Sequence, residues 1–411
     1  MTEDLMDFSL AENESSIIKV IGVGGGGGNA VNYMYQQGIK DVDFVICNTD
    51  AQALENSQIP VKIQLGESLT EGRGAGNKPE RGAQSAIENL DDVNEVLSDN
   101  TKMVFITAGM GGGTGTGAAP VIAKAAKEAG ILTVGIVTIP FRFEGRVRLN
   151  QALEGINKLK ENVDSLLVIN NEKLSEIYGD LKLSTAFSKA DDVLATAAKG
   201  IAEIITLHGY INVDFEDVKT VMTDSGVAVM GSASAEGEDR AVMAIREALT
   251  SPLLNSNDVR GARNILLNIS SGGEEVTMDE VGEITDYVQE AVGDSASIIW
   301  GTGQDEALGN KVCVTIIATG FENGGITEEV EKTRSNAFRA TRGSGNSAQQ
   351  TKMKLNEEPE PLEEKKIILT DLKESEIDEI ESIPAYKRKQ KNLKEKQYRS
   401  GNVIKFTLDD E

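Results

Sequence analysis

The residues best suited to chemistry form the segment Gly109–Gly117, which reads Gly-Met-Gly-Gly-Gly-Thr-Gly-Thr-Gly. It follows an apolar run of strand type, Met103–Thr107, and precedes an alanine-rich stretch, Ala118–Ala129, that predicts a helix. Glycine-rich turns leave backbone N–H groups free to point at one anion, and a helix N-terminus favours negative charge. A flexible linker is the alternative, but a linker is rare between a buried-type strand and a helix. The context therefore predicts a phosphate-binding loop.

A second glycine-rich segment lies earlier in the chain, where Gly22–Gly27 satisfies the dinucleotide pattern G-x-G-x-x-G. Taken alone, this pattern predicts a nicotinamide-dinucleotide oxidoreductase. However, a dinucleotide needs one such nest for its pyrophosphate, whereas a nucleoside triphosphate can be held by several. The P-loop pattern G-x-x-x-x-G-K-[ST] is absent, because the chain contains no Gly-Lys pair. Two glycine nests without that lysine favour a nucleotide site that is not a P-loop.

The elements that must position these segments alternate between strand and helix. Strands are expected at Ser16–Val23, Phe44–Cys47, Met103–Thr107, Thr133–Ile139 and Ser165–Ile169, with helices at Asn29–Gln37, Arg81–Leu90, Ala118–Ala129 and Arg146–Asn162 between them. Glycine-rich turns from strand to helix are typical of an α/β fold with a doubly wound parallel sheet. Such sheets bind ligands at the carboxyl ends of their strands.

The rest of the chain divides by its patterning. Thr185–His208 carries apolar residues at helical spacing and predicts one long central helix. Strands at Gly261–Ile269, Ser297–Trp300 and Lys311–Thr319, with helices at Glu238–Ala248 and Thr277–Val292, predict a second, smaller α/β domain. Residues 357–381 hold eleven acids against three lysines, a composition typical of disorder. We therefore expect a flexible segment at 1–15, a nucleotide-binding domain at 16–184, the central helix at 185–208, the second domain at 209–320, a disordered acidic linker at 321–381 and a tail at 382–411.

Composition excludes several classes of protein. A net charge of −25 argues against nucleic acid as a partner, because phosphate backbones require basic surfaces. Cys47 and Cys313 both lie in apolar runs, which favours a reduced, cytoplasmic protein over a disulfide framework. No apolar stretch approaches about 18 residues, so neither a membrane span nor membrane insertion is expected. The single histidine, His208, excludes histidine-based triads and multi-histidine metal sites.

Two glycine nests without a P-loop lysine resemble the tubulin/FtsZ superfamily. Gly111–Gly117 is similar to its signature loop, and the resemblance extends over about 16–320 through Gly22–Ala30, Asn48–Asp50, Gly74–Pro79, Pro140–Arg148 and Asn212–Asp217, plus the tail Ile383–Gln390. The density of these matches identifies the chain as a member of the FtsZ family of bacterial cell division proteins. The resemblance implies a GTPase that assembles head-to-tail into the filaments of the division ring.

The resemblance also implies where GTP or GDP binds. Asn29 and Asn171 resemble the family's base and ribose contacts, and Glu144 and Arg148 its ribose and phosphate contacts. The full set of expected GTP-binding residues is Gly25, Gly26, Gly27, Gly28, Asn29, Asn48, Gly74, Ala75, Gly76, Gly111, Gly112, Gly113, Thr114, Gly115, Thr116, Gly117, Glu144, Arg148, Asn171, Phe187 and Asp191. Asp191 could accept two N–H groups of guanine, which adenine does not present as a pair. Without the resemblance, Phe187 would be a plain core residue, and Glu144 and Arg148 a surface helix pair.

Catalysis is assigned by the same resemblance to Asn212, Asp214 and Asp217, with the two aspartates polarising the attacking water. The simpler interpretation is a helix cap at Asp214 or Asn212, followed by acids of the first turn. In the family these residues act on GTP bound by the next subunit. A central helix of about 24 residues would separate them from their own nucleotide by roughly 36 Å, which agrees with this arrangement. Mg²⁺ would be held by phosphates and water, with no dedicated protein ligands expected.

The tail contains Ile383-Pro384-Ala385-Tyr386-Lys387-Arg388-Lys389-Gln390, which resembles the partner-binding peptide of the family. The residues expected to contact membrane-anchoring and regulatory division proteins are Ile383, Pro384, Tyr386, Arg388 and Lys389. Lys387 replaces an apolar residue of the family peptide. The resemblance places the protein in the cytoplasm, at the mid-cell division ring. Two alternatives remain open from the sequence: a nicotinamide-dinucleotide oxidoreductase, and a non-hydrolysing filament protein of the same fold.

Overall fold

A computed structural model of the protein describes residues 15–39, 41–177, 182–206, 210–250, 259–293 and 296–321. Ten strands of these residues form one sheet in the order β3-β2-β1-β4-β5-β6-β7-β10-β8-β9. The strands are β1 (Ile18–Val23), β2 (Asp43–Asn48), β3 (Val61–Gln64), β4 (Met103–Gly109), β5 (Leu132–Ile139), β6 (Ser165–Asn170), β7 (Gly226–Ala235), β8 (Asn264–Ser271), β9 (Ser297–Gln304) and β10 (Val312–Thr319).

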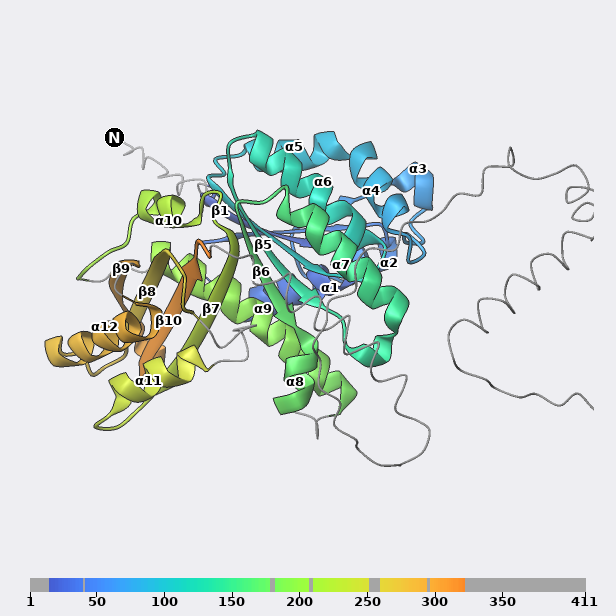
Figure 1. The fold of residues 1–411 in the computed structure, drawn as a ribbon. Coiled ribbons are helices and arrows are strands. Elements are labelled where there is room, and N and C mark those ends of the chain that lie inside the picture. The colour runs from blue at the N-terminus through green and yellow to red at the C-terminus, as the bar shows by residue number, and fades with distance from the viewer. Residues whose placement is uncertain are drawn as a thin grey trace, which may run out of the picture. The chain divides into compact units, whose positions relative to one another are not determined.

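Helices cover the sheet and connect its strands (Figure 1). They are α1 (Gly24–Gln36), α2 (Ala51–Glu55), α3 (Glu67–Thr70), α4 (Pro79–Glu88), α5 (Leu90–Ser98), α6 (Thr114–Glu128), α7 (Arg146–Lys160), α8 (Asn171–Ile177), α9 (Leu183–Thr206), α10 (Phe215–Met222), α11 (Arg240–Leu249) and α12 (Met278–Val292), with short 3₁₀ turns η1 (Arg142–Glu144) and η2 (Glu306–Leu308). Among the described residues, no helix has both the length and the apolar character needed to cross a membrane.

The first six strands pair in parallel, which confirms the predicted parallel sheet. Every residue of β1 and of β5 is buried, as expected of central strands with helices on both faces. The second half of the sheet differs, because β10 pairs antiparallel with both β7 and β8. Three residue pairs between β6 and β7 join the two halves into one continuous sheet.

The central helix α9 runs through this junction over 24 residues (Figure 1). Its buried side chains include Leu194, Ala197, Ile201 and Ile204, which share one face at helical spacing. This apolar face explains why the sequence pattern predicted one long helix. The last residues of the predicted range, 207 and 208, lie outside the described residues.

Both glycine-rich segments begin their helices earlier than the sequence predicted. Helix α1 begins at Gly24 rather than at Asn29, and α6 begins at Thr114 rather than at Ala118. Glycine costs about 1 kcal/mol per residue in a helix interior relative to alanine, so its presence argued for a loop. The phosphate-binding segments are therefore shorter turns whose glycines continue into the first turns of two helices.

Arg240 at the start of α11 holds the segment between β8 and α12 in place. Its side chain is buried, and its Nε donates to Glu280 Oε1 at 2.6 Å. The guanidinium also donates to the backbone oxygens of Glu274, Glu275 and Asn310 at 3.3, 3.1 and 3.0 Å. One cation thus joins the segment between β8 and α12 to the turn before β10 through three backbone oxygens.

We expect Arg240→Ala to lower the free energy of unfolding by about 3 kcal/mol, because it leaves Glu280 without its buried partner. Urea unfolding followed by circular dichroism measures this change. Arg246→Ala, on the exposed face of the same helix, serves as the control and should change stability by less than about 0.5 kcal/mol. Equal effects of the two variants would contradict the account.

Candidate functional site

The two glycine-rich segments lie side by side at the carboxyl ends of β1 and β4, where they pack backbone against backbone. A Cβ on Gly24 would lie 2.7 Å from the Gly115 nitrogen, and one on Gly26 would lie 3.1 Å from the Gly109 Cα. Real Cβ atoms are not found below 3.0 Å from a neighbour, so only glycine permits the approach at Gly24. The N-termini of α1 and α6 are thereby brought together at one anion-binding position.

A cavity of about 400 Å³ opens above these two helix N-termini. Its volume falls within the range of about 300–1,000 Å³ that small-molecule sites occupy. Twelve of the residues predicted to bind nucleotide line it: Gly25, Gly26, Asn29, Gly112, Gly113, Thr114, Gly115, Glu144, Arg148, Asn171, Phe187 and Asp191. Gly28 and Asn48 line a smaller adjoining cavity that shares Gly25 and Asn29. The structure therefore gathers in one place residues that are far apart in the sequence.

The remaining predicted contacts lie beside the cavity rather than on its wall. Gly27, Gly111, Thr116 and Gly117 form the packing beneath it, and Gly74, Ala75 and Gly76 lie in the adjoining loop. Gly27 faces the backbone oxygen of Thr107, and Thr116 Oγ1 accepts from the Gly111 N–H at 2.9 Å. Ala75 packs against Gly113, and the Gly74 N–H donates to the Thr49 oxygen at 3.1 Å. Their roles in binding GTP remain predictions.

Asp191 on α9 faces the cavity with its carboxyl group largely removed from water. Among the described residues, it has no hydrogen-bond or ion-pair partner. Burial raises the pKa of its carboxyl from 3.8 to about 6. A carboxylate kept in an apolar setting without a partner destabilises the fold, so its presence indicates a ligand that supplies the missing donors.

Two further residues complete this end of the cavity. Phe187, one helical turn before Asp191, is 39% exposed and contacts Phe141 edge-to-face with ring centroids 5.3 Å apart. It is therefore not the plain core residue of the alternative interpretation, since part of its ring borders the cavity. Asn171 is buried, and its Oδ1 atom has no hydrogen-bond partner in the part of the chain that the structure describes. An unsatisfied buried acceptor on a cavity wall suits a ligand hydroxyl or amino group.

Glu144 and Arg148 form an ion pair at the cavity rim, with 2.8 Å between Glu144 Oε2 and Arg148 Nη1. The other carboxylate oxygen of Glu144 accepts from the Phe141 N–H at 3.0 Å, which fixes the glutamate. The arginine side chain is about half exposed and can therefore reach a ligand phosphate.

Sequence reasoning missed several residues of the cavity wall. Met110, Thr138, Ala190 and Leu194 also line it. Thr138 lies one residue before the end of β5, so the rule that ligands bind at the carboxyl ends of parallel strands could have identified it. Met110 lies inside the glycine-rich segment Gly109–Gly117 and could have been included with it, whereas Ala190 and Leu194 carry no signal beyond ordinary apolar patterning.

The three residues assigned to catalysis lie away from this cavity, beyond the other end of α9. Asp214 caps α10: the Asp217 N–H donates to Asp214 Oδ1 at 2.8 Å, and the Asp214 N–H donates to Asp217 Oδ2 at 3.3 Å. The helix-cap interpretation is thus confirmed. Asp214 and Asn212 are nevertheless exposed, so capping does not prevent a second role.

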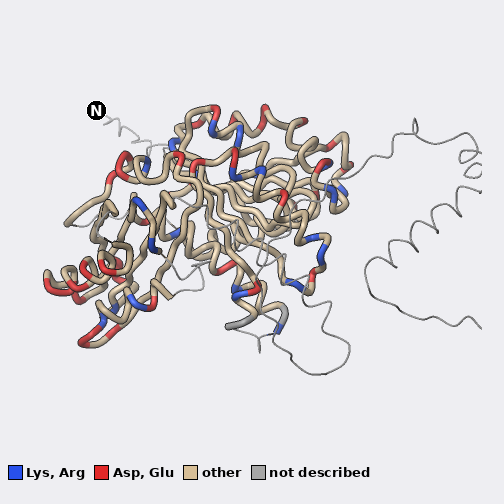
Figure 2. Tube along the Cα trace, in the orientation of Figure 1, with Lys and Arg blue, Asp and Glu red and all other residues tan. Residues whose placement is uncertain are grey.

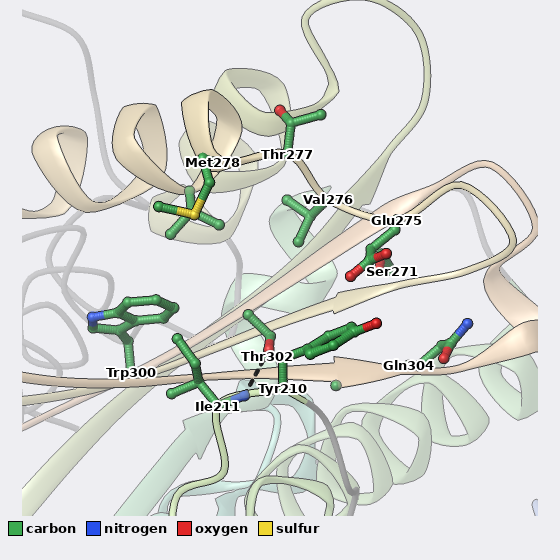
Figure 3. A pocket seen from close by; sticks show the side chains of 12 residues that line it. Tyr210, Ile211, Ser271, Glu275, Val276, Thr277, Met278, Trp300, Thr302 and Gln304 are labelled. Carbon is green, nitrogen blue, oxygen red and sulfur yellow. Dashed lines mark hydrogen bonds between the residues drawn. The ribbon is translucent and has the colours of Figure 1, made fainter.

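A second cavity of about 420 Å³ lies next to this acidic segment (Figure 3). Tyr210 and Ile211 form one side of it, Trp300 and Thr302 of β9 lie alongside, and Met278 at the start of α12 closes it. Tyr210 and Met278, which both line this cavity, are 86% and 83% exposed. The cavity thus carries an exposed apolar rim beside the acids.

Comparison with known proteins decides the family. The family model described as Tubulin/FtsZ family, GTPase domain, matches residues 17–179, and FtsZ family, C-terminal domain, matches 226–322. The cell division protein FtsZ of Porphyromonas gingivalis is 51% identical over 325 residues, which cover 78% of this chain and 71% of that protein. The chain belongs to the FtsZ family. It is a tubulin-like GTPase of cell division, and the oxidoreductase alternative is wrong.

Other FtsZ proteins and solved structures agree with this assignment. FtsZ of Pseudomonas aeruginosa is 50% identical over 317 residues, covering 76% of this chain and 80% of that protein. The structure of an empty FtsZ dimer from M. jannaschii matches with a TM-score of 0.70 and 44% identity, covering 74% of this chain and 88% of that one. A GTPγS-bound protofilament of CetZ2 from Haloferax volcanii matches with a TM-score of 0.66 at 22% identity, over 79% and 99% of the two chains, and shows the shared fold alone.

In the part of the chain that the structure describes, no three His, Cys, Asp or Glu side chains are grouped so that they could hold an ion. The tail residues Ile383, Pro384, Tyr386, Arg388 and Lys389 lie outside the described residues.

Proposed function

We propose that this FtsZ-family protein binds GTP in the cavity above α1 and α6 and hydrolyses it where two subunits meet head-to-tail. The observation that carries the proposal is the separation of two incomplete half-sites. The cavity supplies a glycine nest and the carboxylate of Asp191, and among the described residues that line it the other acid is Glu144, which is paired with Arg148. Asp214 and Asp217 lie beyond the C-terminal end of α9, and the part of that helix between the cavity residue Leu194 and Thr206 alone spans about 18 Å.

Base recognition rests on Asp191, with its carboxylate accepting the two N–H groups that guanine presents on one edge. Phe187 supplies a partly exposed ring for the base, and Asn171 an unsatisfied acceptor for the base or the ribose. At the other end, the amides of Gly112–Gly115 and the N-terminus of α6 hold the phosphates, and Arg148 reaches them from the rim. Mg²⁺ bound between the phosphates would supply charge neutralisation.

Head-to-tail assembly is supported by two pairs of exposed apolar side chains, one beside the nucleotide cavity and one beside the proposed catalytic acids. Phe143 and Val147 are 64% and 68% exposed beside the nucleotide cavity, in a segment that also carries Arg142, Arg146 and Arg148. Tyr210 and Met278 are exposed beside Asp214, next to α12, which has five acids and no Lys or Arg (Figure 2). Joining the two patches buries both and pairs opposite charges. Because the two surfaces differ, the contact repeats and produces a filament.

In that filament each subunit's acids would face the γ-phosphate of its neighbour. Asp214 and Asp217 would orient and polarise the attacking water, and Asn212 would support its position. The backbone N–H groups at the N-termini of α1 and α6 would stabilise the negative charge that develops on the phosphate in the transition state.

Equilibrium binding separates this proposal from a dinucleotide site. We expect the protein to bind GTP and GDP stoichiometrically and NADH not at all. Fluorescence titration measures both. Tight binding of NADH without binding of GTP would contradict the proposal.

The pKa of Asp191 predicts that guanine binding weakens in acid. Because the ionised carboxylate is the binding form and its pKa is about 6, affinity should be constant above neutrality and fall below pH 6. We expect the dissociation constant at pH 5.5 to be about four times that at pH 7.5. Guanosine is the appropriate ligand, because it has no phosphate that titrates in this range. An unchanged constant between the two pH values would show that Asp191 does not contact the base.

The tail supports a further part of the proposal. We infer that Ile383–Lys389 binds membrane-anchoring and regulatory division proteins and so places the filaments at the mid-cell ring. Removal of residues 382–411 should leave GTP turnover unchanged and abolish the localisation of a fluorescent fusion to that ring. Normal localisation of the shortened protein would contradict this assignment.

A further inference from the structure

The segment that leads to the proposed catalytic acids is attached to strand β9. Thr302 of β9 makes two hydrogen bonds to Ile211. The Thr302 N–H donates to the Ile211 oxygen at 2.9 Å, and Thr302 Oγ1 accepts from the Ile211 N–H at 3.3 Å (Figure 3). One threonine thus satisfies both backbone groups of Ile211. β9 is the last strand of the sheet, so this side of the strand is open to such a contact.

Gly301, the preceding residue, allows the segment to come this close. A Cβ at that position would lie 2.8 Å from Val213 Cγ2 and 3.0 Å from the Ile211 oxygen. Glycine is unfavourable inside a strand unless another part of the backbone approaches closely, as it does here. Gly301 is therefore explained by the contact with Ile211 and Val213.

The residues that contact β9, Ile211 and Val213, are the immediate neighbours in the chain of Asn212 and Asp214. Val213 is buried in the core between β9 and α10, and Asp214 follows it directly as the N-cap of α10. Asn212 lies between the two anchored residues. A shift of Ile211 or Val213 by a few tenths of an ångström must therefore move Asn212 and Asp214.

We propose that Gly301 and Thr302 are positioning residues for hydrolysis, which hold Asn212 and Asp214 in the place that the neighbouring subunit's nucleotide requires. The inference rests on the proposed role of the acids and adds the residues that set their position. An added Cβ at Gly301 would lie 2.8 Å from Val213 Cγ2, and ordinary contact begins at 3.4 Å, so the segment must move by roughly 0.6 Å. Catalytic groups must be held within about 0.5 Å of their productive geometry, so a displacement of this size is large enough to lower turnover.

Gly301→Ala tests the close approach. We expect phosphate release per polymerised subunit to fall at least roughly fivefold, because the added methyl group displaces the Ile211 and Val213 backbone. Neither residue lines the nucleotide cavity, so GTP affinity of the dilute protein should stay within about twofold of the unchanged chain. Gly282→Ala is the control, because a Cβ at Gly282 on α12 meets no atom within 4 Å.

Thr302→Val and Thr302→Ser test the hydrogen bond if Gly301→Ala does not fold. Valine keeps the shape of threonine but removes the acceptor for the Ile211 N–H, whereas serine keeps it. We expect valine to lower turnover per polymerised subunit roughly threefold and to speed hydrogen exchange of the Ile211 amide, and serine to restore both. Equal turnover and exchange for valine and the unchanged chain would overturn the proposal.

Three further outcomes distinguish the positioning role from the proposed function. If Gly301→Ala abolishes assembly with a slowly hydrolysed GTP analogue, Gly301 belongs to the subunit contact and the positioning role is wrong. If Asp214→Asn retains full turnover, the proposed catalytic acids are wrong, and the positioning role falls with them. Loss of turnover in Asp214→Asn with no effect of Gly301→Ala or Thr302→Val leaves the proposed function intact and rejects the positioning role alone.

Discussion

Asp214→Asn is expected to lower GTP turnover about 100-fold while the protein still binds GTP and assembles. A positioned carboxylate that polarises water contributes about 10²–10⁴-fold to such reactions, and asparagine removes its charge. Asparagine caps helices as well as aspartate does, so α10 keeps its N-cap and the fold is preserved. Phosphate release measured together with light scattering separates hydrolysis from assembly.

Asp214→Ala completes this experiment. It removes the charge and the cap together, and loss of the cap should cost a further ~1 kcal/mol of stability. Equal loss of turnover in the two variants, with lower stability only in the alanine variant, assigns the effect to the charge. Full turnover in Asp214→Asn would show that Asp214 serves only as the helix cap seen in the structure.

Asp191→Asn is expected to weaken GTP binding about 100-fold or more and to improve binding of xanthosine triphosphate. Sites that pair a buried polar group with a ligand discriminate strongly, because the wrong ligand leaves that group unpaired. The asparagine amide presents a donor where xanthine has a carbonyl in place of the guanine amino group. Competition binding of the two nucleotides measures the change of preference.

Asp192→Asn is the matched control for this prediction. Asp192 adjoins Asp191 but accepts from the Tyr33 hydroxyl at 3.0 Å and pairs with Lys189 at 3.1 Å, away from the cavity. It should leave the nucleotide preference unchanged. If both variants weakened GTP binding equally, the effect would come from helix α9 as a whole and not from contact with the base.

Asp191→Asn should also stabilise the ligand-free protein. Because the folded pKa of Asp191 is raised to about 6, the stability that its neutral form provides is complete below about pH 3.8 and is lost as the pH rises through about 6. An uncharged amide avoids this loss, and after allowance for solvent screening we expect a gain of about 1–2 kcal/mol at pH 7. Urea unfolding of the nucleotide-free protein at pH 7 measures it, and no gain would show that the carboxylate is satisfied in the free state.

The sequence predicted the nucleotide-binding half of the fold well, because its elements carry strong local signals. The parallel strands are continuous apolar runs, and α9 has an apolar face at helical spacing along its whole length. Strand β7 was missed, since its residues Gly226–Ala235 are small and weakly apolar. Its conformation is determined by pairing with β10, more than 70 residues later in the chain. Such long-range pairing leaves no local pattern to recognise.

The site was predictable to a different extent at its two ends. The glycine nest followed from residue type and context, and the structure places Gly25, Gly26 and Gly112–Gly115 on one cavity wall. Asp191, Phe187 and Asn171 came from the resemblance to the family, because a single carboxylate in a helix has no distinctive local pattern. The support that Thr302 gives to Ile211 could not be predicted, since 91 residues separate the two along the chain.

The central claim is that hydrolysis requires two subunits, and GTP turnover per subunit as a function of protein concentration tests it most directly. The account predicts almost no turnover in dilute protein, a threshold at which filaments form, and a steep rise above it. Binding of GTP should remain saturated across the whole range. Turnover per subunit that stays constant from dilute to concentrated protein would show that each subunit completes its own active site, and would contradict the account.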